Sequence, residues 1–186
     1  LGLSPTTCLL LVQRGLSTAE EVKKFFKPNL NDLHDPFLMP DMEKAVRRLN
    51  DALGNKEKIL IYGDYDVDGT TAVSLVYKYL RPYTSSLDYY IPDRYDEGYG
   101  ISFKGINYAK ENGITLVISL DCGIKAIEKI EYAKQLGIDF IICDHHMPDD
   151  VLPDAVAVLD AKRTDSQYPY EHLSGCGVGF KFMQAF

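Results

Sequence analysis

Short apolar runs alternate with stretches of helical spacing from residue 58 onward. The runs are 58–62, 87–91, 115–120, 139–143 and 155–159, and the spacing between them predicts helices over 70–81, 103–112 and 124–136. Strands that alternate with helices predict a parallel sheet whose two faces are both covered. We therefore expect an α/β fold, with a Rossmann-like parallel sheet and helices on both of its faces.

The first 57 residues follow a different pattern. Thr18 and Glu21 form a capping box at the start of one short helix, and residues 41–53 carry apolar side chains at helical spacing between Asp41 and Gly54. We expect a helical N-terminal lead-in over 1–57 and a single domain over 58–186. The first residue is Leu and the last stretch reads as an interrupted helix, so we expect an excised piece of a longer protein.

Composition narrows the class of protein. Hydrophobic residues make up 46% and charged residues 25%, and no apolar run approaches the length of a membrane span. The four cysteines are scattered without a C-x-x-C pair, which predicts reduced thiols and a cytoplasmic location. The net charge of -7 argues against a simple basic surface for nucleic acid, but divalent ions can balance acidic ligands in an enzyme that acts on it.

Acidic residues and a histidine pair follow four of the predicted strands. The segments are "GDYDVDG" after 58–62, "PDRYDEGYG" after 87–91, "DCG" after 115–120 and "DHH" after 139–143. The carboxyl ends of parallel strands meet at one edge of a sheet, where ligands bind. We therefore expect Asp66, Asp68, Asp121 and His145 to meet in one crevice.

The stretch "DVDGTT" (66–71) allows several kinds of site. The simplest is a turn in which an aspartate caps the next helix. This interpretation is disfavoured because it leaves three crowded negative charges without a positive partner. A calcium loop counted from Asp64 needs a glutamate where Leu75 stands, which excludes it. A haloacid-dehalogenase-type phosphatase would use Asp66 as nucleophile and Asp68 as acid/base with one magnesium ion, but "GDY" separates Asp66 from the strand and "DHH" has no role there.

A pair of divalent ions accounts for all the segments. Mixed aspartate and histidine ligands suit manganese, with magnesium as the alternative, and two such ions clamp the oxygens of a phosphoryl displacement. Asp66 and Asp68 would serve one ion each if the loop is locally extended. Asp121, at the end of a central strand, is the candidate bridge, and His145 is the imidazole ligand.

The remaining candidates have both functional and structural interpretations. His146 would face a substrate phosphate and Asp144 would orient an imidazole, whereas either histidine could be an ordinary hydrogen-bonded residue. Arg94 would contact a phosphate and Tyr99 a base, or the arginine would pair with its acidic neighbours and the tyrosine would pack on the sheet. The N–H groups of "SGCGVGF" (174–180) would bind a phosphate or form a tight packing turn.

Four motifs carry a family resemblance. In order, "GDYDVDGTTA" (63–72), "IPDRYDEGYG" (91–100), "ISLDCGI" (118–124) and "CDHH" (143–146) resemble those of the DHH phosphoesterase superfamily. Within it the chain is most similar to the RecJ-type, single-stranded-DNA-specific exonuclease branch, which residues 25–49 and 173–182 also resemble. The resemblance extends over nearly the whole chain.

The resemblance implies a hydrolase that degrades single-stranded DNA from its 5′ end to mononucleotides in recombination and repair. Manganese or magnesium, as two ions in the complete enzyme, would be the cofactor. Its ligands would be Asp66, Asp68, Asp121 and His145. His146 would contact the scissile phosphate, and Asp64 would lie beside the site. The partners would be single-stranded DNA and proteins of repair and replication. No association with a membrane is expected.

The sequence also departs from parts of the superfamily. Tyr62 stands where pyrophosphatase-type relatives carry a histidine, which favours the DNA branch. A further metal-binding aspartate and a second, DHH-associated domain are expected beyond residue 186. We therefore expect the 186-residue chain alone to have little nuclease activity. Alternatives are a DHH hydrolase of oligoribonucleotides, cyclic dinucleotides or pyrophosphate, and a scaffold that has lost its chemistry, which the four ligands present in the chain disfavour.

Overall fold

The computed structural model describes residues 2–186, and the chain separates into two compact units that divide between Asp35 and Pro36. The first unit contains α1 (Pro5–Gln13), α2 (Ala19–Phe26) and the 3-10 turn η1 (Leu30–Asp32). The predicted capping box of α2 is confirmed, because the Thr18 hydroxyl accepts the Glu21 N–H and the Glu21 carboxylate accepts the Thr18 N–H. Helix α1 was not predicted.

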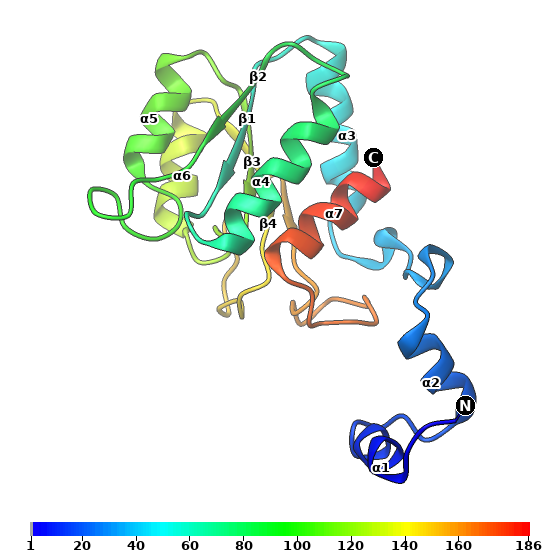
Figure 1. Cartoon of the computed structure of the whole chain (residues 1–186). Helices are drawn as coiled ribbons and strands as arrows, with labels where there is room; N and C mark the ends of the chain where they lie inside the picture. Colours follow the sequence, from blue (N-terminus) through cyan, green and yellow to red (C-terminus); the bar gives the residue numbers. More distant parts are fainter. Residues whose placement is uncertain (1) are drawn as a thin grey trace. The chain divides into compact units, whose positions relative to one another are not determined.

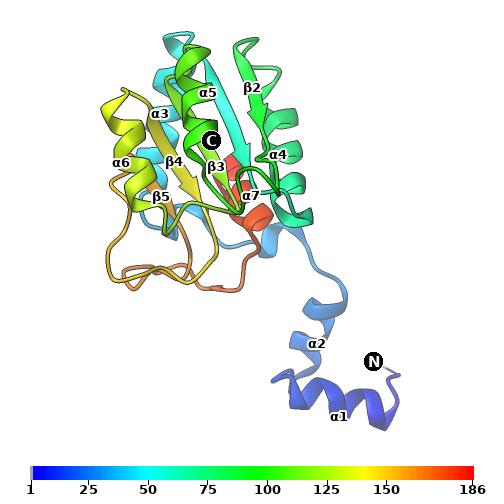
Figure 2. The same ribbon diagram turned by 90° about the vertical axis from the view of Figure 1, so that its left-hand side faces the viewer.

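The second unit is built on a five-stranded parallel sheet. Its strands are β1 (Ile59–Gly63), β2 (Leu87–Tyr90), β3 (Leu116–Leu120), β4 (Asp139–Cys143) and β5 (Ala157–Leu159), in the order β2-β1-β3-β4-β5 (Figures 1 and 2). All five predicted strands are confirmed to within two residues. The chain leaves β1 for β2 on one side and returns to β3 on the other, so the topological switch point lies between β1 and β3. Ligands of doubly wound sheets bind at this point.

Helices cover both faces of the sheet, as the sequence predicts. Figure 1 shows α3 (Met42–Gly54), α4 (Val67–Leu80) and α7 (Gly175–Ala185) on one face, and α5 (Phe103–Glu111) and α6 (Ile127–Gln135) on the other. Alternate residues along each central strand supply the two cores. Ile59 and Ile61 pack with the first set of helices, and Leu60 and Tyr62 pack with the second. The sheet edge that carries the strand carboxyl ends is left for the loops.

Helix α3 packs within the second unit, which begins at Pro36 with the 3-10 turn η2 (Pro36–Leu38). Its Leu49 is fully buried, and its Arg48 donates to Asp139 of β4 and to Glu57, each at 2.7 Å. The compact unit therefore starts before residue 58. Our boundary between residues 57 and 58 stays a proposal about where the DHH domain begins, and it does not coincide with the boundary of the compact unit.

Three helix starts differ from the sequence-based predictions. Asp41 precedes α3 as predicted but has φ +61 and makes no capping hydrogen bond; its carboxylate instead accepts from Arg163 at 2.6 Å. Helix α4 begins at Val67 rather than 70, because Asp66 caps it. Helix α6 begins at Ile127 rather than 124. Over residues 2–186, the helices are all too short or too polar to span a bilayer.

Candidate functional site

Four neighbouring strands each end directly before an aspartate. Gly63, Leu120, Cys143 and Leu159 are consecutive partners in the register of β1, β3, β4 and β5, so the residues that follow them form a row along the carboxyl edge. These residues are Asp64, Asp121, Asp144 and Asp160, and each is at most 1% exposed. Four buried carboxylates in one row require hydrogen-bond donors or cations near them. The strand-end rule used on the sequence therefore holds for four of the five strands of the sheet.

The loop after β1 is held close to the first turn of α4 by two glycines. A Cβ on Gly63 would lie 2.3 Å from Val73, and one on Gly69 would lie 2.5 Å from the Asp64 carbonyl oxygen. Only glycine permits this approach. The helix therefore starts immediately after "GDYD", which places Asp66 at its N-cap.

Val67 and Asp68 are already helical, so the locally extended loop on which we made the arrangement of one ion for each aspartate conditional is not formed. The Asp66 carboxylate accepts the Gly69 N–H at 2.9 Å, so Asp66 makes the capping contact that we considered as the simpler interpretation. Asp68 lies one residue into the helix, where its side chain points to the start of α7. The two carboxylates therefore have different surroundings, although the charges of both add to burial in raising the pKa of Asp121.

Asp68 is bound by the N-terminus of α7. Its Oδ2 accepts the Gly175 N–H and its Oδ1 accepts the Cys176 N–H, both at 2.8 Å. The unpaired N–H groups at a helix start favour an anion. Here the anion is a carboxylate of the chain itself, so the N–H groups of Gly175 and Cys176 already have a partner other than a substrate phosphate. The segment is also the tight packing turn that we considered.

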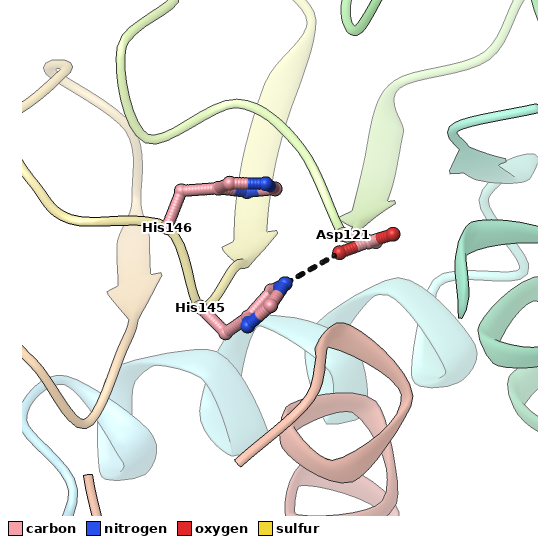
Figure 3. Close-up of side chains that lie close together, drawn as sticks. All are labelled: Asp121, His145 and His146. Atoms are coloured by element: carbon pink, nitrogen blue, oxygen red, sulfur yellow. Dashed lines mark ion pairs between the residues drawn. The ribbon is translucent and has the colours of Figure 1, made fainter. Parts of the chain in front are cut away.

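Asp121 is the buried centre of the site. It has φ +60, a left-handed conformation that few residues other than glycine adopt. His145 Nε2 lies 3.1 Å from its Oδ1 and 3.8 Å from Asp68 Oδ2, and Figure 3 shows the imidazole of His145 pointing at Asp121. A Cβ on Gly175 would lie 2.4 Å from the same Oδ1, so α7 packs directly on this carboxylate. Burial, together with the charge of Asp68, raises the pKa of Asp121 to about 7.

His146 belongs to a separate hydrogen-bonded chain. Its Nδ1 lies 2.7 Å from Asp144 Oδ1, and its Nε2 lies 3.1 Å from the hydroxyl of Tyr99. Burial alone would raise the pKa of Asp144, but hydrogen bonds from His146 and from the Ile124 N–H hold it below its usual range. The hydrogen bond to Asp144 raises the pKa of His146, whereas burial and the charge of His146 lower the pKa of His145. The pKa values of the two histidines are therefore shifted in opposite directions, and the imidazole that Asp144 orients is that of His146.

The geometry of one group suits a metal ion. Ligand atoms of Asp121, His145 and His146 lie within 4.8 Å of one another. Within residues 2–186, the buried oxygens Asp64 Oδ2 and Asp121 Oδ1 have no well-aligned hydrogen-bond donor. Buried carboxylate oxygens without donors, beside an imidazole, are the donor set that manganese or magnesium accepts. Of our four predicted ligands, Asp121 and His145 lie in this group, Asp68 lies beside His145, and Asp66 lies outside it.

The two predicted substrate residues lie on the loop before α5. The Arg94 guanidinium lies 5.0 Å from the centre of the Tyr65 ring, and the ion pairs found over residues 2–186 do not include Arg94 with its acidic neighbours. Tyr99 is 52% exposed and lies edge-on to His146, and its hydroxyl donates to the carbonyl oxygen of Asp121, directly after β3, at 3.3 Å. Arg94 is therefore free of the ion pairs that we weighed against a functional role, whereas Tyr99 contacts both the sheet edge and His146.

Sequence reasoning missed Asp160 and Lys162. Asp160 follows β5, its Oδ2 has no hydrogen-bond partner among the described residues, and burial raises its pKa to about 6. Lys162 donates its Nζ to the carbonyl oxygen of His145, which supports the "DHH" loop from the segment after β5. The strand-end rule would have found Asp160, because "AVAVL" is followed by "DAK". Nothing in the sequence marks Lys162, since its contact depends on the path of the loop.

Comparisons with known proteins agree with this architecture. A model of the DHH family, N-terminal domain, matches residues 58–186. The single-stranded-DNA-specific exonuclease RecJ of Bacillus subtilis (strain 168) is 42% identical over 185 residues, which cover 100% of this chain and 24% of that protein. RecJ of Escherichia coli (strain K12) is 35% identical over 98% of this chain and 31% of its own length. The chain thus spans about a quarter to a third of these curated relatives.

Solved structures show the same fold. A crystal structure of exonuclease RecJ bound to manganese superposes with a TM-score of 0.71 at 28% identity, covering 79% of this chain and 37% of that one. RecJ from Thermus thermophilus in complex with Mn2+ gives a TM-score of 0.73 at 23% identity, covering 100% and 28%. The family model covers most of the chain and includes the whole row of aspartates, so the chain belongs to the DHH family.

Proposed function

We propose that this chain is the catalytic part of a metal-dependent phosphodiesterase that hydrolyses single-stranded DNA from the 5′ end to mononucleotides, in DNA recombination and repair. The observation that carries the proposal is the group of Asp121 and His145 at the carboxyl ends of β3 and β4, next to the switch point, with buried carboxylate oxygens that have no well-aligned hydrogen-bond donor. The names of the RecJ relatives support the choice of substrate. Because the chain covers only a part of those relatives, the activity is proposed for the full-length protein.

Asp68, Asp121 and His145 are the residues that would hold a divalent ion, with Asp64, Asp66 and His146 next to them. Manganese or magnesium bound there would supply positive charge to a phosphate and lower the pKa of an attacking water. We retain Asp121 as the candidate bridge between two ions, since it is the most buried of the three and lies beside both Asp68 and His145.

His146 would bind the scissile phosphate. The carboxylate of Asp144 can only accept, so the Nδ1–H of His146 donates to it and fixes the tautomer. Its Nε2 then faces the hydroxyl of Tyr99, and the hydrogen bond to Asp144 favours a proton at this atom by raising the pKa. A protonated imidazole held in this orientation donates a charge-assisted hydrogen bond to a phosphate oxygen.

Asp66 gives a reason to set aside the haloacid-dehalogenase-type mechanism. A covalent nucleophile has to point its carboxylate at the phosphate, but that of Asp66 accepts the Gly69 N–H as the cap of α4. The residue that directly follows β1 is Asp64, which is fully buried. Asp66 does not follow the strand directly, and Asp64 follows it but is not accessible. Neither carboxylate therefore combines the strand-end position and the exposure that phospho-aspartate chemistry requires.

The proposal is tested with the full-length protein and manganese. We expect a 5′-labelled single strand to be digested to mononucleotides, with a double strand, a dinucleotide and pyrophosphate as comparison substrates. Preferred hydrolysis of the dinucleotide or pyrophosphate would instead assign a DHH enzyme for small substrates. The 186-residue chain assayed in parallel is expected to digest little. Repair and replication proteins remain proposed partners.

A cytoplasmic location is also proposed. It is supported by the free thiols of the buried residues Cys122 and Cys143.

A further inference from the structure

The loop between β2 and α5 carries Tyr99 to the site, and one carboxylate of that loop connects its two ends. The Oε1 of Glu97 accepts the Asp93 N–H at 2.9 Å, and its Oε2 accepts the hydroxyl of Ser102. The Tyr90 hydroxyl lies 3.0 Å from the first oxygen and 2.9 Å from the second. The hydrolysis proposed above does not use Glu97. This half-buried carboxylate therefore needs its own explanation.

The carboxylate of Glu97 is charged and acts only as an acceptor. Burial alone would raise its pKa, but hydrogen bonds from Ser102, from the Asp93 N–H and from Tyr90 hold it below its usual range. Bonds to a charged acceptor are stronger than those between neutral groups. Tyr90 ends β2 and Ser102 caps α5, so one side chain fixes both where the loop leaves the sheet and where it enters the helix.

Tyr99 needs such support, because the residue on each side of it is glycine. Gly98 has φ +77 and Gly100 has φ +79, and a Cβ on Gly98 would have no heavy atom within 4 Å. Glycine loses more conformational freedom on folding than other residues, and nothing packs where a Cβ of Gly98 would lie. The position of Tyr99 therefore depends on what holds the two ends of this short segment.

The far end of the segment is held by Tyr62. Its buried hydroxyl donates to the Gly100 carbonyl oxygen at 2.9 Å and accepts the Ser102 N–H at 3.1 Å. The Tyr62 ring also stacks on that of Tyr90, with the ring centres 5.4 Å apart, and the Tyr90 hydroxyl in turn binds Glu97. Glu97 and Tyr62 therefore form one framework around the segment.

We propose that Glu97 is a positioning residue, which holds Tyr99 against His146 and thereby sets how tightly the enzyme binds a single strand. The Tyr99 hydroxyl lies 3.1 Å from His146 Nε2, and its ring lies edge-on to the imidazole. The same hydroxyl donates to the Asp121 carbonyl oxygen at 3.3 Å, so a displaced loop loses both contacts. The inference deepens the proposed function and rests on it, because His146 is the residue that would bind the scissile phosphate.

The test uses variants that separate the hydrogen bonds of Glu97 from its charge. Glu97→Ala removes all of these bonds. Glu97→Gln removes the charge but can keep the bonds, because the hydroxyls of Ser102 and Tyr90 accept as well as donate. Tyr90→Phe removes one donor and keeps the ring. Asp96→Ala, on the same loop, is the matched control, since the Asp96 side chain is 75% exposed and its ion pair with Lys104 is 3.8 Å long.

Two measurements are made on the full-length protein. The first is digestion of a 5′-phosphorylated single strand with manganese, which gives KM and kcat separately, together with the affinity for Mn2+. The second needs no activity. NMR of isotope-labelled histidine rings follows His146 Nε2, which is assigned with a His146→Gln variant, and Tyr99→Phe shows where the resonance lies when the tyrosine hydroxyl is absent.

We expect Glu97→Ala to raise KM about ten-fold, the size of one lost aromatic contact with a base, and to leave kcat and Mn2+ affinity nearly unchanged. It should add nothing to Tyr99→Ala, because the side chain that it positions is already gone. Glu97→Gln should restore KM almost to the wild-type value, and Tyr90→Phe should raise KM less than Glu97→Ala does. Glu97→Ala should move the His146 Nε2 resonance as Tyr99→Phe does, and Asp96→Ala should change neither measurement.

Two results would overturn the inference while leaving the proposed function in place. One is a Glu97→Gln variant as defective as Glu97→Ala, which would show that the charge acts directly. The other is independent effects of Glu97→Ala and Tyr99→Ala on KM. If Glu97→Ala fails to fold, Tyr90→Phe decides, since a wild-type KM with an unmoved His146 resonance would overturn the inference. Wild-type protein that digests no single strand contradicts the proposed function, and the NMR comparison then still shows whether Glu97 positions Tyr99.

Discussion

Asp121 and Asp144 occupy equivalent positions but have opposite properties. They follow the adjacent strands β3 and β4 in the same register, and each is 1% exposed. Burial raises the pKa of Asp121 to about 7, whereas hydrogen bonds outweigh burial and lower the pKa of Asp144. The difference lies in their donors. Asp144 accepts from the backbone of Ile124, His145 and His146 and from the His146 ring, while Asp121 Oδ1 accepts no well-aligned bond from the described residues.

This difference divides the edge of the sheet into two regions. The Asp144 region is completed by the protein's own N–H groups, so it needs no ion to be stable. In the Asp121 region a buried carboxylate oxygen has no well-aligned hydrogen bond and only the imidazole of His145 close to it, which is costly unless a cation balances the charge. The first region holds an imidazole in place, and the second is the one that we propose to hold metal. Substitutions can therefore be chosen to act on one region or the other.

The largest effect is expected from Asp121→Asn. Loss of this carboxylate should weaken Mn2+ binding by more than the roughly 10–100-fold that is usual for residues supporting a ligand, because Asp121 would be a ligand itself. The metal-free protein should become more stable, since the buried charge is gone. Calorimetric titration with Mn2+ and thermal unfolding in EDTA measure the two effects. A variant that binds Mn2+ normally would place the metal elsewhere.

Asp144→Asn should have the opposite effect on stability. An amide offers one acceptor oxygen and turns a donor toward the N–H groups that the carboxylate satisfied, which should cost about 1–3 kcal/mol of unfolding free energy. The pKa of His146 should fall, because the hydrogen bond to Asp144 is what raises it. Urea unfolding and NMR titration of the ring report these changes. Asp149→Asn, at an exposed position, is the control. Equal unfolding free energies for the two variants would contradict the claim that the N–H groups around Asp144 stabilise its region.

Gly175→Ala should loosen the metal region without removing a ligand. The new Cβ would meet Asp121 Oδ1 at 2.4 Å, and the displaced helix start would also shift the N–H groups that bind Asp68. We expect Mn2+ affinity to drop about 10-fold, in the range of changes beside a ligand. Gly177→Ala on the same turn meets the Leu173 side chain at 3.3 Å and Ser174 Oγ at an ordinary 3.7 Å, with no contact to Asp121, and should bind Mn2+ normally. Equal affinities for the two variants would contradict the role of Gly175.

The smallest effect concerns Asp160→Asn and its dependence on pH. The folded pKa of Asp160, about 6, lies above the usual value of 3.8, so the stability contributed by this group is present at low pH and is lost as pH rises through 6. The amide carries no charge and keeps the oxygen that accepts the Lys162 N–H. The variant should therefore be about 1 kcal/mol more stable than wild type at pH 7.5 and no more stable at pH 4.

Urea unfolding in EDTA at the two pH values measures this difference. Asp154→Asn, at an exposed position, is the control and should show no such trend. A constant difference between wild type and Asp160→Asn across the pH range would show that the buried charge is not its cause.

Periodicity and strand direction predicted most of the fold and the place of the site. The five strands, their parallel order along one edge and the meeting of Asp121 with His145 all follow from apolar runs that end in acidic residues. What could not be predicted depends on packing between distant segments. The contact of Asp68 with the start of α7 joins residues 107 positions apart, and no local pattern encodes it. The capping role of Asp66 was visible as an alternative, but the crowding of three aspartates made us favour a metal site over a simple turn.

Anomalous diffraction from crystals of the full-length protein soaked in manganese is the decisive experiment for the two regions of the sheet edge. We expect strong density between Asp121, His145 and Asp68, with a second ion about 3.5–4 Å away that shares Asp121, and no ion against Asp144. Density beside Asp144 with none at Asp121, or ions bound only at a distance from His145, would contradict the division of the site into a metal region and a region completed by the protein.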